Sequence, residues 1–234
     1  MKPVRISRQD TKMRSTVPKG LPDDQSHRAR IVATIVPLAI ILTCVLIEVT
    51  LQMGDLGVFG PPRLRQWAYQ HGGFWPGLLQ DWTPNYTLQP VLMFLTYGFL
   101  HGGLAHLLIN MITLYSLGQG VIDRVGPWQF LVVYFAAMIG GAAGFGMIAD
   151  TLYPMVGASG ALFGLAGALM AWNYVDRYTY RLDLWPIARV AGLLLVINLV
   201  MWWALDGQLA WQTHLGGFLT GWIVALLLDP RGRI

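Results

Sequence analysis

At residues 156–164 the chain reads Val156-Gly157-Ala158-Ser159-Gly160-Ala161-Leu162-Phe163-Gly164, which places one hydroxyl between two glycines, directly ahead of an apolar run of helical length. Because Ser159 would open that helix, the free N–H groups of the first turn would point toward its hydroxyl. Helix N-termini stabilise negative charge, and the flanking glycines leave room for another backbone to approach. The stretch therefore predicts a chemically active serine at a helix start.

The composition around this stretch is typical of a membrane protein. Of 234 residues, 55% are hydrophobic and only 12% are charged, about half the charged fraction of a soluble domain. Half of the sixteen Lys and Arg residues fall within residues 1–30. The net charge of +4 therefore indicates a basic tail rather than a surface that binds nucleic acid. Cys44 is the single cysteine, which excludes an intrachain disulfide.

The apolar runs divide the chain into three parts. We expect a basic, largely disordered cytoplasmic tail at 1–30, a six-span domain at 31–228, and a short cytoplasmic tail at 229–234. The expected spans are 31–51, 104–121, 128–149, 159–174, 187–205 and 213–228. Glu48 falls near the end of the first span, where its carboxylate is expected to reach the interface.

The segment at 52–90 differs from the spans, because it mixes Gly and Pro with Trp67, Trp75 and Trp82 and carries few charges. Aromatic amphipathic segments prefer the headgroup zone, so we expect a long first loop that associates with the outer leaflet. The apolar run after this segment is interrupted at His101-Gly102-Gly103, and the second span is expected to begin after this break.

The distribution of positive charge predicts the orientation. With the N-terminus inside, only Arg63 and Arg65 of the sixteen Lys and Arg residues lie on the outer side. Such an asymmetry is a strong positive-inside signal, so both termini are expected in the cytoplasm. Length and the absence of a transit-like segment favour a bacterial inner membrane.

Two further polar islands stand in apolar surroundings. His101, His106 and Asn110 begin the second span, and His214 begins the sixth. In the predicted topology these spans and the fourth all run from outside to inside, so the islands share one outer-leaflet level with Ser159. Polar groups inside a membrane are costly and usually face a cavity or a partner.

Serine and histidine together supply a nucleophile and a general base. His106 and Asn110 are four residues apart, hence on one helix face, and both can donate hydrogen bonds toward an oxyanion. The hypothesis is peptide-bond hydrolysis. The alternative is that these side chains only join helices. Asp206 or Asp150 could orient His214 from a loop, but a Ser/His dyad is the simpler interpretation. No metal site is expected, because no Cys or carboxylate joins the histidines at ligand spacing.

Glycines mark the helix faces that would bring the serine and histidine together. In the fourth span Gly160, Gly164 and Gly167 share one face, and in the sixth His214 shares a face with Gly217 and Gly221. Glycine faces let helices approach closely in lipid, so the face that carries His214 is the face built for contact.

Taken together, the motifs resemble the rhomboid family of intramembrane serine proteases. The matching residues are His101-Gly-Gly-Leu-Ala-His106-Leu-Leu-Ile-Asn110, then Gly157-Ala-Ser159-Gly160, then His214 with Gly217 and Gly221. The resemblance implies an all-α bundle of six transmembrane helices. It implies Ser159 as nucleophile and His214 as general base, an oxyanion hole of His106, Asn110 and the Ser159 amide, and a first loop structured by His101. Phe163 stands where an aromatic ring is expected to stack on the base.

The resemblance also implies the kind of partner. Family members cleave transmembrane segments of membrane-protein substrates near the outer face without a cofactor; no nucleic acid is involved, and the oligomeric state stays open. Two departures stand out. Where many members carry a Trp-Arg pair in the first loop, this chain has Leu92-Met93, and the acidic residue often found after the second span is shifted to Asp123.

Two other functions remain open at the level of sequence. The first is a catalytically silent rhomboid-like protein that binds transmembrane clients. The second is a small transporter or channel, which would favour polar residues in both halves of the bilayer and inverted repeats. The clustering of polar residues at one level argues against the second.

Overall fold

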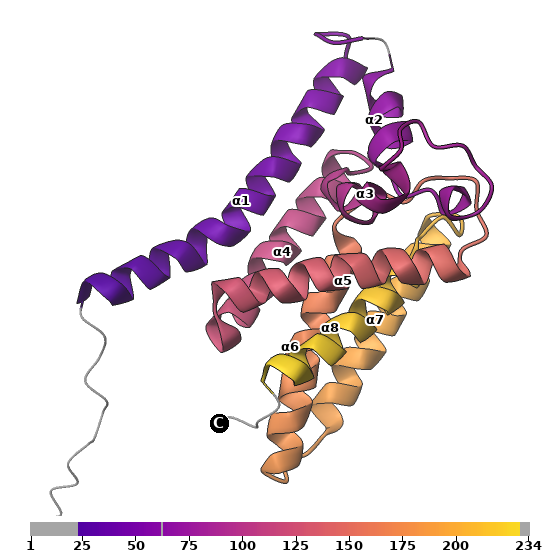
Figure 1. The fold of residues 1–234 in the computed structure, drawn as a ribbon. Helices are drawn as coiled ribbons and strands as arrows, with labels where there is room; N and C mark the ends of the chain where they lie inside the picture. The colour runs from indigo at the N-terminus through magenta and orange to yellow at the C-terminus, as the bar shows by residue number, and fades with distance from the viewer. Residues whose placement is uncertain (1–22, 62, 230–234) are drawn as a thin grey trace, which may run out of the picture.

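The computed structural model describes residues 23–61 and 63–229, with side chains from residue 31 onward, and the described part is all-helical (Figure 1). Its elements are α1 (Asp23–Asp55), α2 (Leu64–Gly72), the 3-10 turn η1 (Pro76–Leu79), α3 (Gln89–Thr96), the 3-10 turn η2 (Tyr97–Phe99), α4 (Leu104–Val125), α5 (Pro127–Ile148), α6 (Ser159–Thr179), α7 (Trp185–Ala204) and α8 (Trp211–Leu228). The predicted all-α membrane bundle is confirmed.

The long helices α1, α4, α5, α6, α7 and α8 follow the six predicted spans closely. The largest difference is at α1, which begins at Asp23, eight residues before the expected start at Ile31. Part of the predicted tail is therefore helical. The rest of that tail, residues 1–22, and the C-terminal residues 230–234 lie outside the described residues, so the two tails stay predictions.

Four of these helices are long and apolar enough to cross a membrane by length and composition alone: α1 from Ile31, α4, α5 and α7. The other two, α6 and α8, carry many glycines and several polar side chains on the faces that they turn toward each other. Small residues on the contacting faces are expected of membrane helices whose backbones approach each other closely.

The centre of the bundle is a close contact between α6 and α8. A Cβ added at Gly217 would overlap the carbonyl oxygen of Gly160, and one added at Gly221 would overlap the carbonyl oxygen of Gly164. On its other side α8 lies against α5, where a Cβ added at Gly144 would lie 3.1 Å from the Gly216 Cα. The glycines thus let three helix backbones touch, of which the spacing predicted the contact between α6 and α8.

The first loop, between α1 and α4, is folded into α2, η1, α3 and η2. Phe74 and Met155 exchange two backbone hydrogen bonds of 2.9 Å, and the Gly157 N–H donates to the Tyr97 carbonyl at 3.0 Å. The segment that precedes Ser159 is therefore held by backbone bonds to the first loop.

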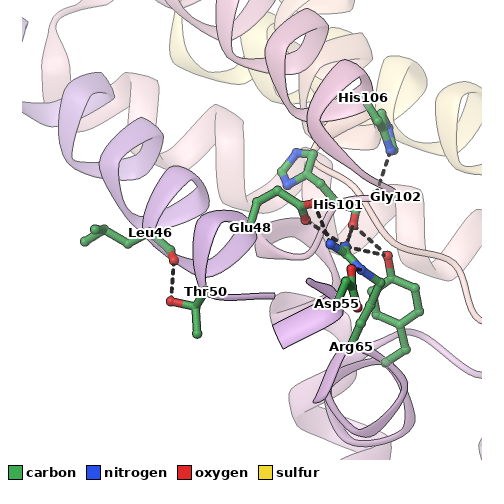
Figure 2. A network of polar contacts seen from close by, with 9 residues as sticks. Leu46, Glu48, Thr50, Asp55, Arg65, His101, Gly102 and His106 are labelled. Carbon is green, nitrogen blue, oxygen red and sulfur yellow. Dashed lines mark hydrogen bonds and ion pairs between the residues drawn. The ribbon is translucent and has the colours of Figure 1, made fainter. Parts of the chain in front are cut away.

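Arg65 in α2 ties the first loop to α1 and to the start of α4 (Figure 2). Its guanidinium makes a paired contact with Glu48 at 2.8 and 3.0 Å, contacts Asp55 at 2.6 Å, and donates to the His101 carbonyl at 3.1 Å. Tyr69 donates to the same carbonyl at 2.6 Å. Glu48 is fully buried in the protein, where Arg65 reaches inward to pair with it. Its position relative to the membrane interface stays a prediction.

We expect Gly221→Ala to destabilise the bundle by about 1–3 kcal/mol or more, because the added methyl must separate two touching backbones. Gly192→Ala on α7 is the matched control, since nothing lies within 4 Å of its added Cβ. Thermal unfolding in detergent measures both. Equal midpoints for the two variants would contradict the close contact.

We expect Arg65→Ala to cost about 3–5 kcal/mol, because it leaves the Glu48 carboxylate buried without its partner. Asp55→Asn removes only the more exposed pair, whose worth is about 0–1 kcal/mol. Chemical unfolding in mixed micelles compares the two variants. A larger loss for Asp55→Asn would refute the assigned importance of the buried pair.

Candidate active site

Ser159 and His214 come from different helices and meet where α6 and α8 both begin, at one end of the contact between them. Ser159 is the first residue of α6, and His214 lies in the first turn of α8. The Ser159 Oγ is 2.9 Å from the His214 Nε2, within hydrogen-bond distance. The structure therefore brings together the two side chains that the sequence singled out.

The His214 ring is held on one face by an aromatic ring. Phe163, one turn after Ser159 on α6, stacks on it with ring centroids 4.2 Å apart and planes 10° from parallel. His214 is 8% exposed, while Ser159 and Phe163 are half-buried. The imidazole thus lies in a largely dry site, with the serine hydroxyl at its edge.

His106 and Asn110 lie on the opposite side of Ser159, on α4. The Gly102 N–H donates to the His106 Nδ1 at 3.2 Å, so a neutral ring carries its hydrogen on Nε2. The position of a Cβ at Gly157 lies 2.9 Å from that Nε2 and 3.6 Å from the Asn110 Nδ2. Asn110 is 4% exposed, and its Nδ2 has no hydrogen-bond partner among the described residues. A buried donor thus lies unused beside the loop that leads into Ser159.

His101 is fully buried behind His106, with the two ring centroids 5.4 Å apart and edge to face. Burial, with a smaller contribution from His106, lowers the pKa of His101 to about 4, so its ring is neutral at physiological pH. Its carbonyl accepts one hydrogen bond from Arg65 (Figure 2) and another from Tyr69. His101 therefore contacts the first loop through its backbone and His106 through its ring.

Two glycines shape the backbone next to the serine. Gly157 has φ +124°, a conformation that side chains rarely adopt, and a Cβ there would press on His106. At Gly160 a Cβ would come 2.8 Å from the Thr213 Oγ1 on α8. Both positions therefore admit only glycine without a shift of neighbouring atoms.

One polar contact was missed from the sequence: the His214 Nδ1 lies 2.6 Å from the Asn198 Oδ1 on α7. Asp206 and Asp150, the two carboxylates considered for this position, lie in loops, and neither is bonded to His214. Asn198 is the only side-chain amide in the apolar run 190–205. Its isolation among apolar residues was the feature of the sequence that could have identified it as a site residue.

The described residues contain no group of three His, Cys, Asp or Glu side chains that could hold a metal ion. The three histidines of the site contact other protein groups. His106 and His214 each make a hydrogen bond through a ring nitrogen, and His101 packs edge to face on His106.

Comparison with known proteins identifies the family to which the helices and the motifs belong. The profile of the Rhomboid domain family matches residues 89–231, more than half of the chain. The chain belongs to the rhomboid family. The match extends from α3 to beyond the end of α8, so it includes Ser159, His214 and every side chain that surrounds them in the site.

Several curated relatives of this rhomboid are known. It is 35% identical over 129 residues to the rhomboid protease GluP of Bacillus subtilis (strain 168), and 31% identical over 133 residues to the rhomboid-type serine protease 2 of Emericella nidulans. It is also 34% identical over 84 residues to the inactive RHOMBOID-like protein 8 of Arabidopsis thaliana. In the same order, the three alignments cover 55%, 55% and 34% of this chain. They cover 24%, 25% and 24% of the length of the respective relatives. The chain thus spans about a quarter of their length.

The departure at Leu92-Met93 has a structural counterpart in this rhomboid. Met93 is fully buried and Leu92 is exposed, so neither provides a polar contact to the loop. A guanidinium does reach the backbone before α4, and it comes from Arg65, earlier in the chain. The shifted acid, Asp123, is exposed; the neighbouring Arg124 pairs with Asp176 and Asp229.

We expect Gly157→Ala to lower the rate at which a fluorophosphonate probe labels Ser159 by about tenfold or more, because the new methyl displaces His106. Gly103→Ala is the matched control: Gly103 also has a positive φ, of +109°, but its added Cβ meets nothing within 4 Å. Equal labelling rates of the two variants would show that backbone strain, and not displacement of His106, determines how fast Ser159 reacts.

Proposed function

We propose that this rhomboid is an intramembrane serine endopeptidase that uses a Ser159/His214 dyad to hydrolyse peptide bonds in or near transmembrane segments at the outer leaflet. The observation that carries the proposal is the 2.9 Å separation of the Ser159 Oγ and the His214 Nε2. Membership of a family with serine proteases among its members supports it.

In the first half of the reaction, the Ser159 Oγ attacks the scissile carbonyl carbon while the His214 Nε2 accepts the hydroxyl proton. The carbonyl oxygen becomes an oxyanion. The unused Asn110 Nδ2, the Nε2–H of His106 and the Ser159 N–H at the start of α6 are the donors available to it. The C–N bond then breaks, and the imidazolium returns its proton to the departing amine. The product is an ester on Ser159.

In the second half, water attacks the ester carbonyl, and His214 again accepts a proton. The second tetrahedral intermediate uses the same donors. It collapses when the bond between the acyl carbon and the Ser159 Oγ breaks, the imidazolium returns its proton to that Oγ, and the carboxylic acid product leaves. Because the half-buried Ser159 lies at the expected outer ends of α6 and α8, water has only a short path to reach it. A level near the outer face therefore suits hydrolysis better than one at the bilayer centre.

Substrates of this proposed protease are transmembrane segments that unwind readily, because a helical backbone hides its carbonyls from a nucleophile. The charge asymmetry of the chain supports cytoplasmic N- and C-termini and a site toward the outer face. We further propose a bacterial inner membrane as its location and the bilayer as its environment, with no cofactor and no nucleic-acid partner.

A second candidate function is the binding of transmembrane clients without cleavage. The similarity to a relative that is named inactive favours it. A client binder does not require an activated serine, whereas a protease does. Reaction with a serine-directed probe therefore separates the two functions.

We expect Ser159→Ala and His214→Ala each to abolish cleavage of a model transmembrane substrate in proteoliposomes, because each removes half of the proton transfer. A fluorophosphonate should label the wild type and the Ser159→Ala variant should remain unlabelled. Ser116→Ala, in the middle of α4, is the control for mutation of a membrane serine. Wild-type cleavage by purified Ser159→Ala would end the proposal.

A further inference from the structure

Asn198 lies on the side of α7 that faces the bundle. Three residues that precede it on the same face, at intervals of about one turn, are half-buried like Asn198: Leu194, Ala191 and Ile187. Most other residues of the helix are exposed. The stripe brings the side-chain amide to the His214 ring, on the nitrogen opposite the one that meets Ser159.

The orientation of this amide is set by a second hydrogen bond. The Asn198 Nδ2 donates to the Leu194 carbonyl at 2.9 Å. Because a carbonyl oxygen can only accept, the amide nitrogen must face Leu194, and the Oδ1 must face His214. A flipped amide would set two acceptors against each other.

The same reasoning extends to the histidine. The Asn198 Oδ1 can only accept, so the His214 Nδ1 that lies 2.6 Å away must carry a hydrogen. In the neutral ring the Nε2 then has a lone pair, and the contact with the Ser159 Oγ is one in which the serine hydroxyl donates. This is the arrangement that a general base needs before the reaction begins.

We propose that Asn198 is a positioning residue that holds His214 in the Nδ1–H tautomer with its Nε2 aimed at Ser159, an inference that rests on the proposed protease function. Without the acceptor, the ring is free to carry its hydrogen on Nε2, and that tautomer cannot take the serine proton. Phe163 fixes the plane of the ring by stacking, but stacking does not choose between its two nitrogens.

The packing of α7 makes this position suitable for mutation. None of the residues of α7 is fully buried, in contrast to α6. Asn198→Leu has a similar volume and lacks the acceptor, so it should leave the α5–α6–α8 core unchanged. Asn198→Asp keeps an acceptor oxygen toward His214 but gives up the hydrogen bond to the Leu194 carbonyl, so it tests the acceptor alone. Val196→Leu, at a position 56% exposed on the same helix, controls for mutation of α7 itself.

The experiment measures cleavage of a transmembrane substrate by the full-length chain in proteoliposomes. We expect Asn198→Leu to lower kcat by about 10- to 100-fold, part of the roughly 10²–10⁴ that general-base catalysis contributes, with KM unchanged. Asn198→Asp should recover most of the loss, and Val196→Leu should match the wild type. Fluorophosphonate labelling of Ser159 should follow the order of kcat.

The tautomer is tested directly by ¹⁵N NMR of histidine-labelled protein, since the two ring nitrogens report which of them carries the hydrogen. We expect Nδ1–H for His214 in the wild type and a loss of that preference in Asn198→Leu. If Asn198→Leu unfolds, the wild-type spectrum and the Asn198→Asp kinetics still decide the matter. An Nε2–H signal in the wild type would overturn the inference.

The remaining outcomes are distinguishable. Wild-type kcat in folded Asn198→Leu would overturn the role of Asn198 while leaving the Ser159/His214 dyad intact. An unchanged Nδ1–H signal of His214 in folded Asn198→Leu would also overturn it, because the tautomer would then not depend on the acceptor. Cleavage by Ser159→Ala in the same assay would instead overturn the proposed function itself.

Discussion

The contact of the α6 and α8 backbones is the constraint on which the site depends. Helices in lipid gain little from the hydrophobic effect, so they associate through close packing, and glycine permits the closest approach. Here the carbonyls of Gly160 and Gly164 lie where side chains at Gly217 and Gly221 would otherwise be. Because both helices are rigid, this register also sets the distance between Ser159 and His214, which lie within one turn of the first glycine pair. Packing and chemistry are therefore fixed by one contact.

Ionic contacts fix the remaining helices at the two ends of the bundle. At one end Arg65 joins α1, α2 and the backbone before α4, and at the other Arg124 joins the end of α4 to Asp176 on α6 and Asp229 beyond α8. A buried carboxylate such as Glu48 is costly alone and is held only with its partner. Such a pair does more to specify one arrangement of the first loop than to add net stability, and that arrangement supports the backbone on which His106 depends.

The sequence predicted the parts of this structure that depend on local pattern. Apolar run lengths predicted six helices, and isolated polar residues at helix starts predicted which side chains meet. It did not predict Asn198 as the partner of His214. The isolated amide marks a polar position on α7, but the contact also depends on how α7 is rotated against α8, which the sequence does not give. Nor did it predict the pair of Glu48 and Arg65, because Arg65 lies in the first loop, whose fold comes from tertiary contacts rather than periodicity.

The polar groups of the site also bear on whether it binds or cuts. A buried donor without a partner costs about 1–3 kcal/mol, and folded proteins rarely keep one without a use. The Asn110 Nδ2 is such a donor among the described residues, and it lies beside Gly157, two residues before the serine. Under the proposed protease function, an oxyanion that forms during acyl transfer would satisfy this donor at the moment of reaction, when its hydrogen bond contributes most. The same position would give Asn110 a role that the proposed client-binding function does not require.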